Sequence, residues 1–116
     1  MLGFGGLYFG PVLDERSLRR HPFYPDAPEQ SAAVPMIIGN THDETRAFMS
    51  GDHTNFFLGW DQLPSRLTFP NLRVDIDPAT VIAEYRRLYP RYSASEVLFA
   101  ATTAARSWRG AIIELE

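Results

Sequence analysis

A group of polar side chains follows an apolar run in the first half of the chain. The run Val34–Ile38 ends at Gly39, and His42, Asp43 and Glu44 come shortly after it. Such side chains can transfer protons in catalysis, bind a metal ion or cap the end of a helix. Each kind of chemistry needs different surroundings, so the neighbouring elements decide between them.

Each interpretation of this group has its own sequence signature. Thr41 and Glu44 fit the pattern T-x-x-E, in which the glutamate binds the backbone amide of a helix N-cap. A carboxylate just past the carboxyl end of a parallel strand instead lies where α/β sheets place their active sites. His42, Glu44 and His53 offer three metal ligands, but the chain has neither the Cys-x-x-Cys of zinc deaminases nor an H-E-x-x-H motif. We therefore expect no metal site, while the cap and the catalytic carboxylate both stay open.

The apolar run itself predicts an α/β fold. A short continuous apolar segment is typical of a strand buried on both faces of a parallel sheet, so we expect a strand over 34–38. A second short strand is expected over Leu7–Leu13. The prolines between 22 and 35 predict a surface loop. Thr41 is placed to cap a short helix that continues through Met49.

Helix signals dominate the second half of the chain. A short helix is expected over 61–67, and Asp77-Pro78 supplies an N-cap followed by proline at the first helical position. Ser93 and Glu96 form a capping box, after which apolar positions keep helical spacing to Leu115. No glycine or asparagine cap follows Leu115, so we expect that the chain has been cut inside this helix.

Three segments carry a family resemblance. "FGPVLD" at 9–14, "VPMIIGNTHDETRAF" at 34–48 and "TTAARSWRGAIIELE" at 102–116 resemble the type-B carboxylesterases, the family of the para-nitrobenzyl esterases and cholinesterases. The resemblance implies that 1–116 is a partial type-B carboxylesterase domain without separate domains, from the C-terminal half of a longer enzyme. It implies part of an α/β-hydrolase fold, with an acid-bearing strand of a mostly parallel sheet and covering helices.

The resemblance also implies a site. Glu44 matches the acid of the family's Ser-Glu-His triad, and Phe48 matches a position that lines the acyl side of the substrate pocket in some members. The parent protein is then expected to be a hydrolase that cleaves small-molecule carboxylic esters through an acyl-enzyme, without a cofactor. Two residues depart from the family pattern, because Glu15 and Thr45 stand where many members have glycine.

The other triad members are not expected within this chain. None of its seven serines lies in G-x-S-x-G, and the α/β-hydrolase order is serine, acid, histidine. His21 precedes the acid, and His42 and His53 lie too close to Glu44 for a crossover to the next parallel strand. The glycine-rich "GFGG" at 3–6 lacks the histidine of an oxyanion-hole motif and is interpreted as a loop. We expect the isolated chain to be inactive.

Composition excludes several function classes. The chain has 116 residues and a net charge of −3, so it has no electrostatic footprint for nucleic acid. It has no cysteine, no apolar run long enough for a membrane span and no basic segment before its apolar N-terminus, so we expect a soluble chain without a signal peptide.

A second hypothesis stays open: a non-catalytic binding or scaffolding module whose long amphipathic helix docks onto another protein.

Overall fold

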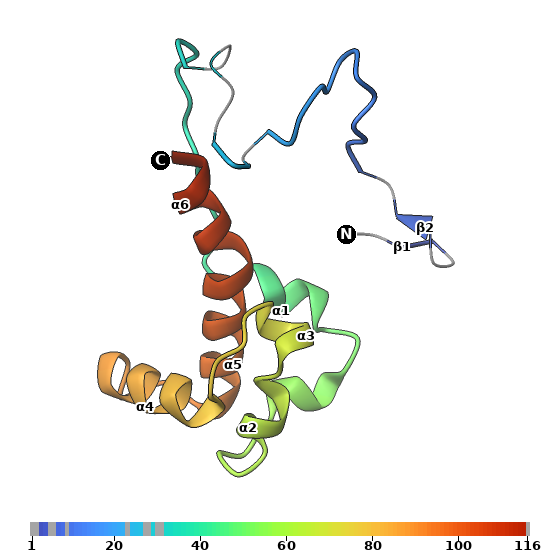
Figure 1. Ribbon diagram of the computed structural model, residues 1–116. Coiled ribbons are helices and arrows are strands. Elements are labelled where there is room, and N and C mark those ends of the chain that lie inside the picture. The colour runs from blue at the N-terminus through green and yellow to red at the C-terminus, as the bar shows by residue number, and fades with distance from the viewer. Residues whose placement is uncertain are drawn as a thin grey trace. The chain divides into compact units, whose positions relative to one another are not determined.

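The computed structural model describes residues 3–4, 7–8, 10–22, 24–26, 29 and 32–115. They fall into two units, an N-terminal unit of residues 1–37 and a C-terminal unit of residues 38–116 (Figure 1). Among the described residues, every α-helix belongs to the C-terminal unit, which also contains the polar group around Glu44.

The N-terminal unit contains one short strand pair. Strands β1 (Gly3–Phe4) and β2 (Leu7–Tyr8) are antiparallel, with Gly3 opposite Tyr8 and Phe4 opposite Leu7. The predicted strand over Leu7–Leu13 was therefore wrong beyond Tyr8, since residues 10–13 are irregular and Phe9 lies outside the described residues. The loop prediction for "GFGG" was wrong for the first two residues, and Gly5 and Gly6 also lie outside the described part.

A tight turn follows at Asp14. Its carboxylate accepts hydrogen bonds from the Ser17 hydroxyl and from the backbone N–H groups of Leu18, Arg16 and Ser17. These donors hold the pKa of the Asp14 carboxyl well below its usual range, the hydroxyl of Ser17 having the largest effect. Glu15, at the second position of the turn, has a φ of 60°, in the left-handed region that glycine enters at least cost.

The α/β fold prediction was wrong. The protein is 50% helix, and in the part of the chain that the structure describes the β1–β2 pair is the only strand pairing. Residues 34–38 form no strand, and Ile37 is 100% exposed. A strand requires a neighbour to bind its backbone groups, and this segment has none among the described residues. Pro35 also removes one of the N–H groups that a ladder would use.

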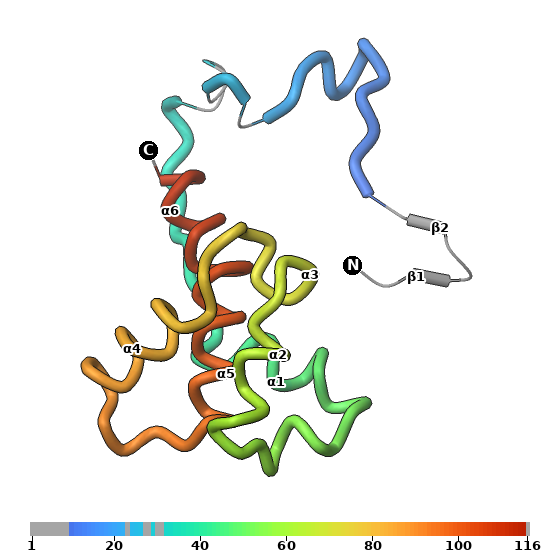
Figure 2. The backbone as a smooth tube through the Cα atoms, turned by 60° about the horizontal axis from the view of Figure 1, so that its bottom comes forward, coloured from blue at the N-terminus to red at the C-terminus, as the bar shows by residue number. Residues whose placement is uncertain are grey.

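The C-terminal unit is built from short helices around one long helical rod (Figure 2). The shorter elements are α1 (Glu44–Phe48), the 3₁₀-helix η2 (His53–Phe56), α2 (Leu63–Arg66), α3 (Phe69–Leu72) and α4 (Pro78–Leu88). The rod comprises α5 (Ala94–Thr103), the π-helical segment η3 (Ala104–Trp108) and α6 (Arg109–Leu115). Helix α5 contacts α1, η2, α2, α3 and α4, so it organises the unit.

The two best-signalled helix starts are confirmed. The Asp77 carboxylate accepts from the backbone N–H groups of Ala79 and Thr80 at the start of α4. At the start of α5, Ser93 and Glu96 form the reciprocal capping box. The predicted helix over 61–67 is shorter, with Gln62 as its N-cap, and helix α3 was not predicted.

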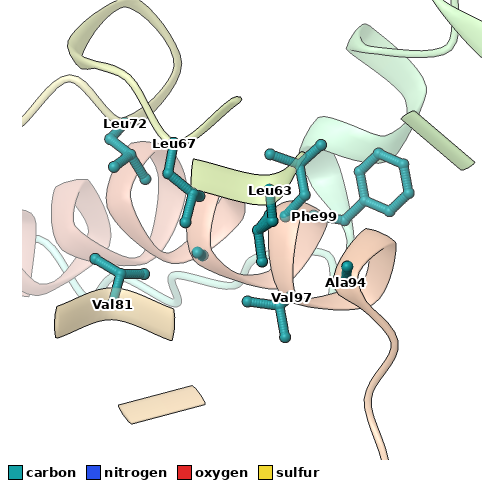
Figure 3. Close-up of a cluster of buried hydrophobic side chains, with 9 residues drawn as sticks. Leu63, Leu67, Leu72, Val81, Ala94, Val97 and Phe99 are labelled. Carbon is teal, nitrogen blue, oxygen red and sulfur yellow. The ribbon is translucent and has the colours of Figure 1, made fainter. Parts of the chain in front are cut away.

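Apolar side chains of α2, α3 and α4 pack against α5 in one cluster. In Figure 3, Leu63 of α2 lies near Val97 and Phe99 of α5, while Leu67, the C-cap of α2, lies beside Leu72. Burying a side chain of this size contributes about 1.5–3 kcal/mol, so this cluster is the main source of stability of the unit. Its buried members are Leu63, Leu67, Leu72, Val81, Ala94, Val97, Leu98, Phe99 and Ala101.

The long rod contains one irregularity. Within η3 the backbone N–H of Arg109 donates to the carbonyl of Ala104, five residues earlier. A π-helical turn rotates the helix that follows it relative to the helix before it. Among the described residues, no helix has the length and apolar character needed to cross a membrane.

Candidate functional site around Glu44

Glu44 is the half-buried first residue of α1, and its carboxylate is held on one side. The Thr41 hydroxyl donates to Oε2 of Glu44 over 2.6 Å. Within the described residues no hydrogen bond or ion pair reaches Oε1. One carboxylate oxygen is therefore fixed and the other can accept a hydrogen bond from a further group.

The capping prediction for this group was wrong. The N-cap of α1 is Asp43 rather than Thr41, and the Asp43 side chain makes no capping hydrogen bond. Thr41 and Glu44 do contact each other, but through their side chains. A different residue has to satisfy the N–H groups of the first helical turn.

Three buried threonines hold α1 against α5. Thr45 is 1% exposed, and Thr102 and Thr103 are fully buried; we call these residues the hydroxyl cluster. The Thr45 backbone N–H donates to Oγ1 of Thr103 over 3.1 Å. Oγ1 of Thr45 lies 2.6 Å from Oγ1 of Thr102 and 2.9 Å from Oγ1 of Thr103.

One arrangement of the protons satisfies every donor in the hydroxyl cluster. The Thr45 N–H donates to Thr103, whose hydroxyl donates to Oγ1 of Thr45. The Thr45 hydroxyl then donates to Thr102, whose hydroxyl donates to the carbonyl of Leu98 over 2.7 Å. The carbonyl of Phe99, 3.0 Å from Oγ1 of Thr45, is a second acceptor for the Thr45 proton. Each hydroxyl is a donor once and an acceptor once, and such chains of hydrogen bonds strengthen one another in a buried site.

The charged side chains next to Glu44 in the sequence interact with residues other than Glu44. Nδ1 of the exposed His42 imidazole lies 3.1 Å from Oδ1 of Asp43. The Arg46 guanidinium lies 5.6 Å from the ring centres of both Phe56 and Phe99, and its side chain is 3.8 Å from Asp43. Arg46 is thus held by a cation–π contact and does not pair with Glu44.

A small hollow of about 70 Å³ lies beside this arginine. On its wall the Glu96 carboxylate accepts from the backbone N–H and the hydroxyl of Ser93, which lowers the pKa of Glu96. The hollow has room for little more than ordered water. Its lining residues are His42, Asp43, Arg46, Tyr92, Glu96 and Phe99.

A larger, open depression lies between the residues before α1 and the helix α6. It measures about 500 Å³ and is mostly apolar. Of the α6 side chains that line it, Ile112 and Leu115 are more than half exposed, while Ala111 is buried. Its lining residues are Ile38, Gly39, Asn40, His42, Trp108, Ala111, Ile112 and Leu115.

The other residues singled out in the sequence do not join Glu44. Phe48 lies one turn further along α1, and its side chain is 62% exposed, outside both depressions. Its predicted contribution to a substrate pocket stays a prediction. His53 begins η2 and is exposed, and no histidine hydrogen bond to Glu44 is formed within the described residues. In the described part of the chain, no group of three or more acidic or histidine side chains could hold a metal ion.

The hydroxyl cluster was missed in the sequence. Thr102 and Thr103 lie four residues after Leu98 and Phe99, so they continue the apolar face of α5. Polar residues on a face that is otherwise buried need hydrogen-bond partners, and that need was a usable signal. The partner, Thr45, is more than 50 positions away in the sequence and had no such signal.

Comparison with known proteins adds no relative. No family model matches the chain, and no curated protein or solved structure is significantly similar to it.

Proposed function

We propose that this chain contributes Glu44 as the acid of a Ser-Glu-His triad in a serine carboxylesterase. The observation that carries the proposal is the state of the Glu44 carboxylate, with Oε2 fixed by Thr41 and Oε1 open to accept from an imidazole. A triad acid requires both properties, because it has to be oriented itself before it can orient the histidine.

In the proposed reaction Glu44 acts through a histidine. Its carboxylate accepts the imidazole N–H, selects the tautomer that can remove the serine proton, and stabilises the imidazolium that forms as the serine attacks an ester carbonyl. The acyl-enzyme is then hydrolysed by water with the same histidine as base. The proposal places the serine and the histidine outside these 116 residues.

The conformation at Glu15 gives further support to the resemblance. Glu15 stands where the carboxylesterase pattern has glycine, and its φ of 60° is one that glycine adopts without steric cost. The backbone at this turn thus fits the residue of the family pattern better than it fits glutamate.

The test is a conservative substitution in the complete gene product that contains this chain. Glu44→Gln keeps the size of the side chain and removes its charge, so kcat for para-nitrophenyl acetate should fall by about 10⁴, as in related triads. Asp43→Asn, at the adjacent and partly exposed carboxylate, is the matched control and should change kcat little. Near-normal turnover by the Glu44→Gln protein would refute the proposal.

The second candidate is a non-catalytic binding or scaffolding module. The open apolar depression beside α6 and its exposed isoleucine and leucine side chains favour it, because exposed apolar patches commonly mark interaction surfaces. A fluorophosphonate probe separates the two candidates, since it labels the activated serine of an esterase. Absence of labelling in the folded complete gene product would favour the binding module.

A further inference from the structure

The first turn of α1 is completed by a residue from another helix. Its N-cap, Asp43, provides no side-chain hydrogen bond, and the N–H of Thr45 is bound by Oγ1 of Thr103 on α5. The two residues are 58 positions apart in the sequence. Thr103 thus performs for α1 the task that an N-cap side chain performs in most helices.

We propose that Thr103 is a positioning residue for Glu44, an inference that rests on the proposed function. The N–H of Thr45 and the carbonyl of Glu44 belong to the same planar peptide group. The hydrogen bond from this N–H to Thr103 fixes the plane, and with it the direction in which the Glu44 side chain leaves the backbone. Thr103 acts on the orientation of the acid and touches neither substrate nor serine.

Glu44 is therefore held at two points. Thr103 fixes its backbone through the Thr45 N–H, and Thr41 fixes its carboxylate through Oε2. Neither contact alone determines where Oε1 lies, because the glutamate side chain has three rotatable bonds between the two points. A misplacement of about 1 Å in a catalytic group can lower the rate by about 10²-fold.

Thr102 is the matched control within the same cluster. It is as buried as Thr103 and its Oγ1 lies 2.6 Å from that of Thr45. Its hydroxyl donates to the carbonyl of Leu98 within α5 and has no hydrogen bond to the backbone of α1. A valine at 102 and a valine at 103 each remove one buried hydroxyl, but only the second leaves the Thr45 N–H without an acceptor.

The test compares these variants in the complete gene product. Thr103→Val should lower kcat for para-nitrophenyl acetate by about 10- to 100-fold with KM nearly unchanged. It should also lower the apparent pKa of the acidic limb of the kcat profile, since a displaced carboxylate stabilises the imidazolium less. Thr103→Ser keeps the hydroxyl acceptor, so its kcat and its apparent pKa should be close to those of the wild type. Thr102→Val should leave the pH profile of kcat unchanged.

A double variant decides whether Thr103 acts through Glu44. In a Glu44→Gln protein, Thr103→Val should reduce kcat no further, because the charge that it orients is gone. A full additional loss in that background would overturn the proposal, as would equal effects of valine at 102 and 103. If Thr103→Val fails to fold, Thr103→Cys replaces it as a smaller change with a weak acceptor.

One measurement does not depend on ester hydrolysis. Amide hydrogen exchange at Thr45 should accelerate in Thr103→Val and stay slow in Thr103→Ser, while exchange at Val97 in α5 stays unchanged. Unchanged exchange at Thr45 would refute the positioning contact even if Glu44→Gln is inactive. Near-normal turnover by Glu44→Gln would instead refute the triad and leave the exchange result standing.

Discussion

Replacement of Thr45 by valine measures the strength of the hydroxyl cluster. Valine has the shape of threonine, so this change removes a hydroxyl and leaves the packing volume almost unaltered. The lost hydroxyl accepts from Thr103, and its own proton can be donated to Oγ1 of Thr102 or to the carbonyl of Phe99, in a site where all three threonines are buried. The stability of the C-terminal unit should therefore fall although no apolar contact is lost.

The magnitude follows from the bonds that are lost. The Thr103 hydroxyl proton loses its acceptor, and an unsatisfied buried polar group costs about 1–3 kcal/mol. The bond that the Thr45 proton makes, to Thr102 or to the Phe99 carbonyl, adds about 1 kcal/mol, which is the net value of an ordinary hydrogen bond. The total is a loss of about 2–4 kcal/mol in the free energy of unfolding. In a unit of about 80 residues this corresponds to a Tm lower by about 10–30 °C.

The assay is thermal unfolding followed by far-ultraviolet circular dichroism, with Thr45→Ser as the control. Serine keeps the hydroxyl and loses one buried methyl, which costs only about 1 kcal/mol. A double variant with valine at 45 and at 103 should cost less than the sum of the two single changes, because it removes both partners of one bond. Equal Tm values for Thr45→Val and Thr45→Ser would show that the hydrogen bonds of the cluster do not stabilise the protein.

Two further predictions concern surface turns. Hydrogen bonds from the Thr54 hydroxyl and from Arg66 lower the pKa of Asp52 from 3.8 to about 2. The ionised carboxylate therefore stabilises the folded protein fully above pH 3.8, and this stabilisation is lost as the pH falls through about 2. Acid unfolding of Asp52→Asn should accordingly show a shallower loss of stability in that window than the wild type; an identical acid titration would contradict the assignment. At the Asp14 turn, the left-handed conformation of Glu15 costs about 1–2 kcal/mol, and glycine at this position adopts it without that steric cost. Glu15→Gly should therefore slow amide hydrogen exchange at Leu18 several-fold. Faster exchange at Leu18 would contradict the strain argument.

Local chemistry was predictable from the sequence in the second half of the chain. The start of α4 depends on Asp77 and the amides two and three residues later, and the start of α5 depends on Ser93 and Glu96. All of these atoms lie within one helical turn, so a short stretch of sequence contains both partners. The length of the rod through Leu115 was predictable for the same reason, since its apolar spacing is a local property.

The strand prediction failed because a strand has no local partner. Val34–Ile38 has the composition of a buried strand, but only a neighbouring chain segment can bind its backbone groups and cover its side chains. In the described part of the chain no segment does so, and Ile37 is left fully exposed. The apolar pattern indicates that residues 34–38 tend to be buried, but it does not identify the segment that would pair with them.

The start of α1 and the setting of Glu44 were decided by tertiary structure. The sequence placed a carboxylate after Thr41 and favoured a cap at that threonine, whereas the helix begins at Glu44 with its first turn bound to Thr103. Glu44 as a candidate acid was visible in the sequence because it needs only a residue type in a motif. Its orientation depends on a hydroxyl 58 positions further along the chain from Thr45, and such a contact exists only once α5 has packed against α1.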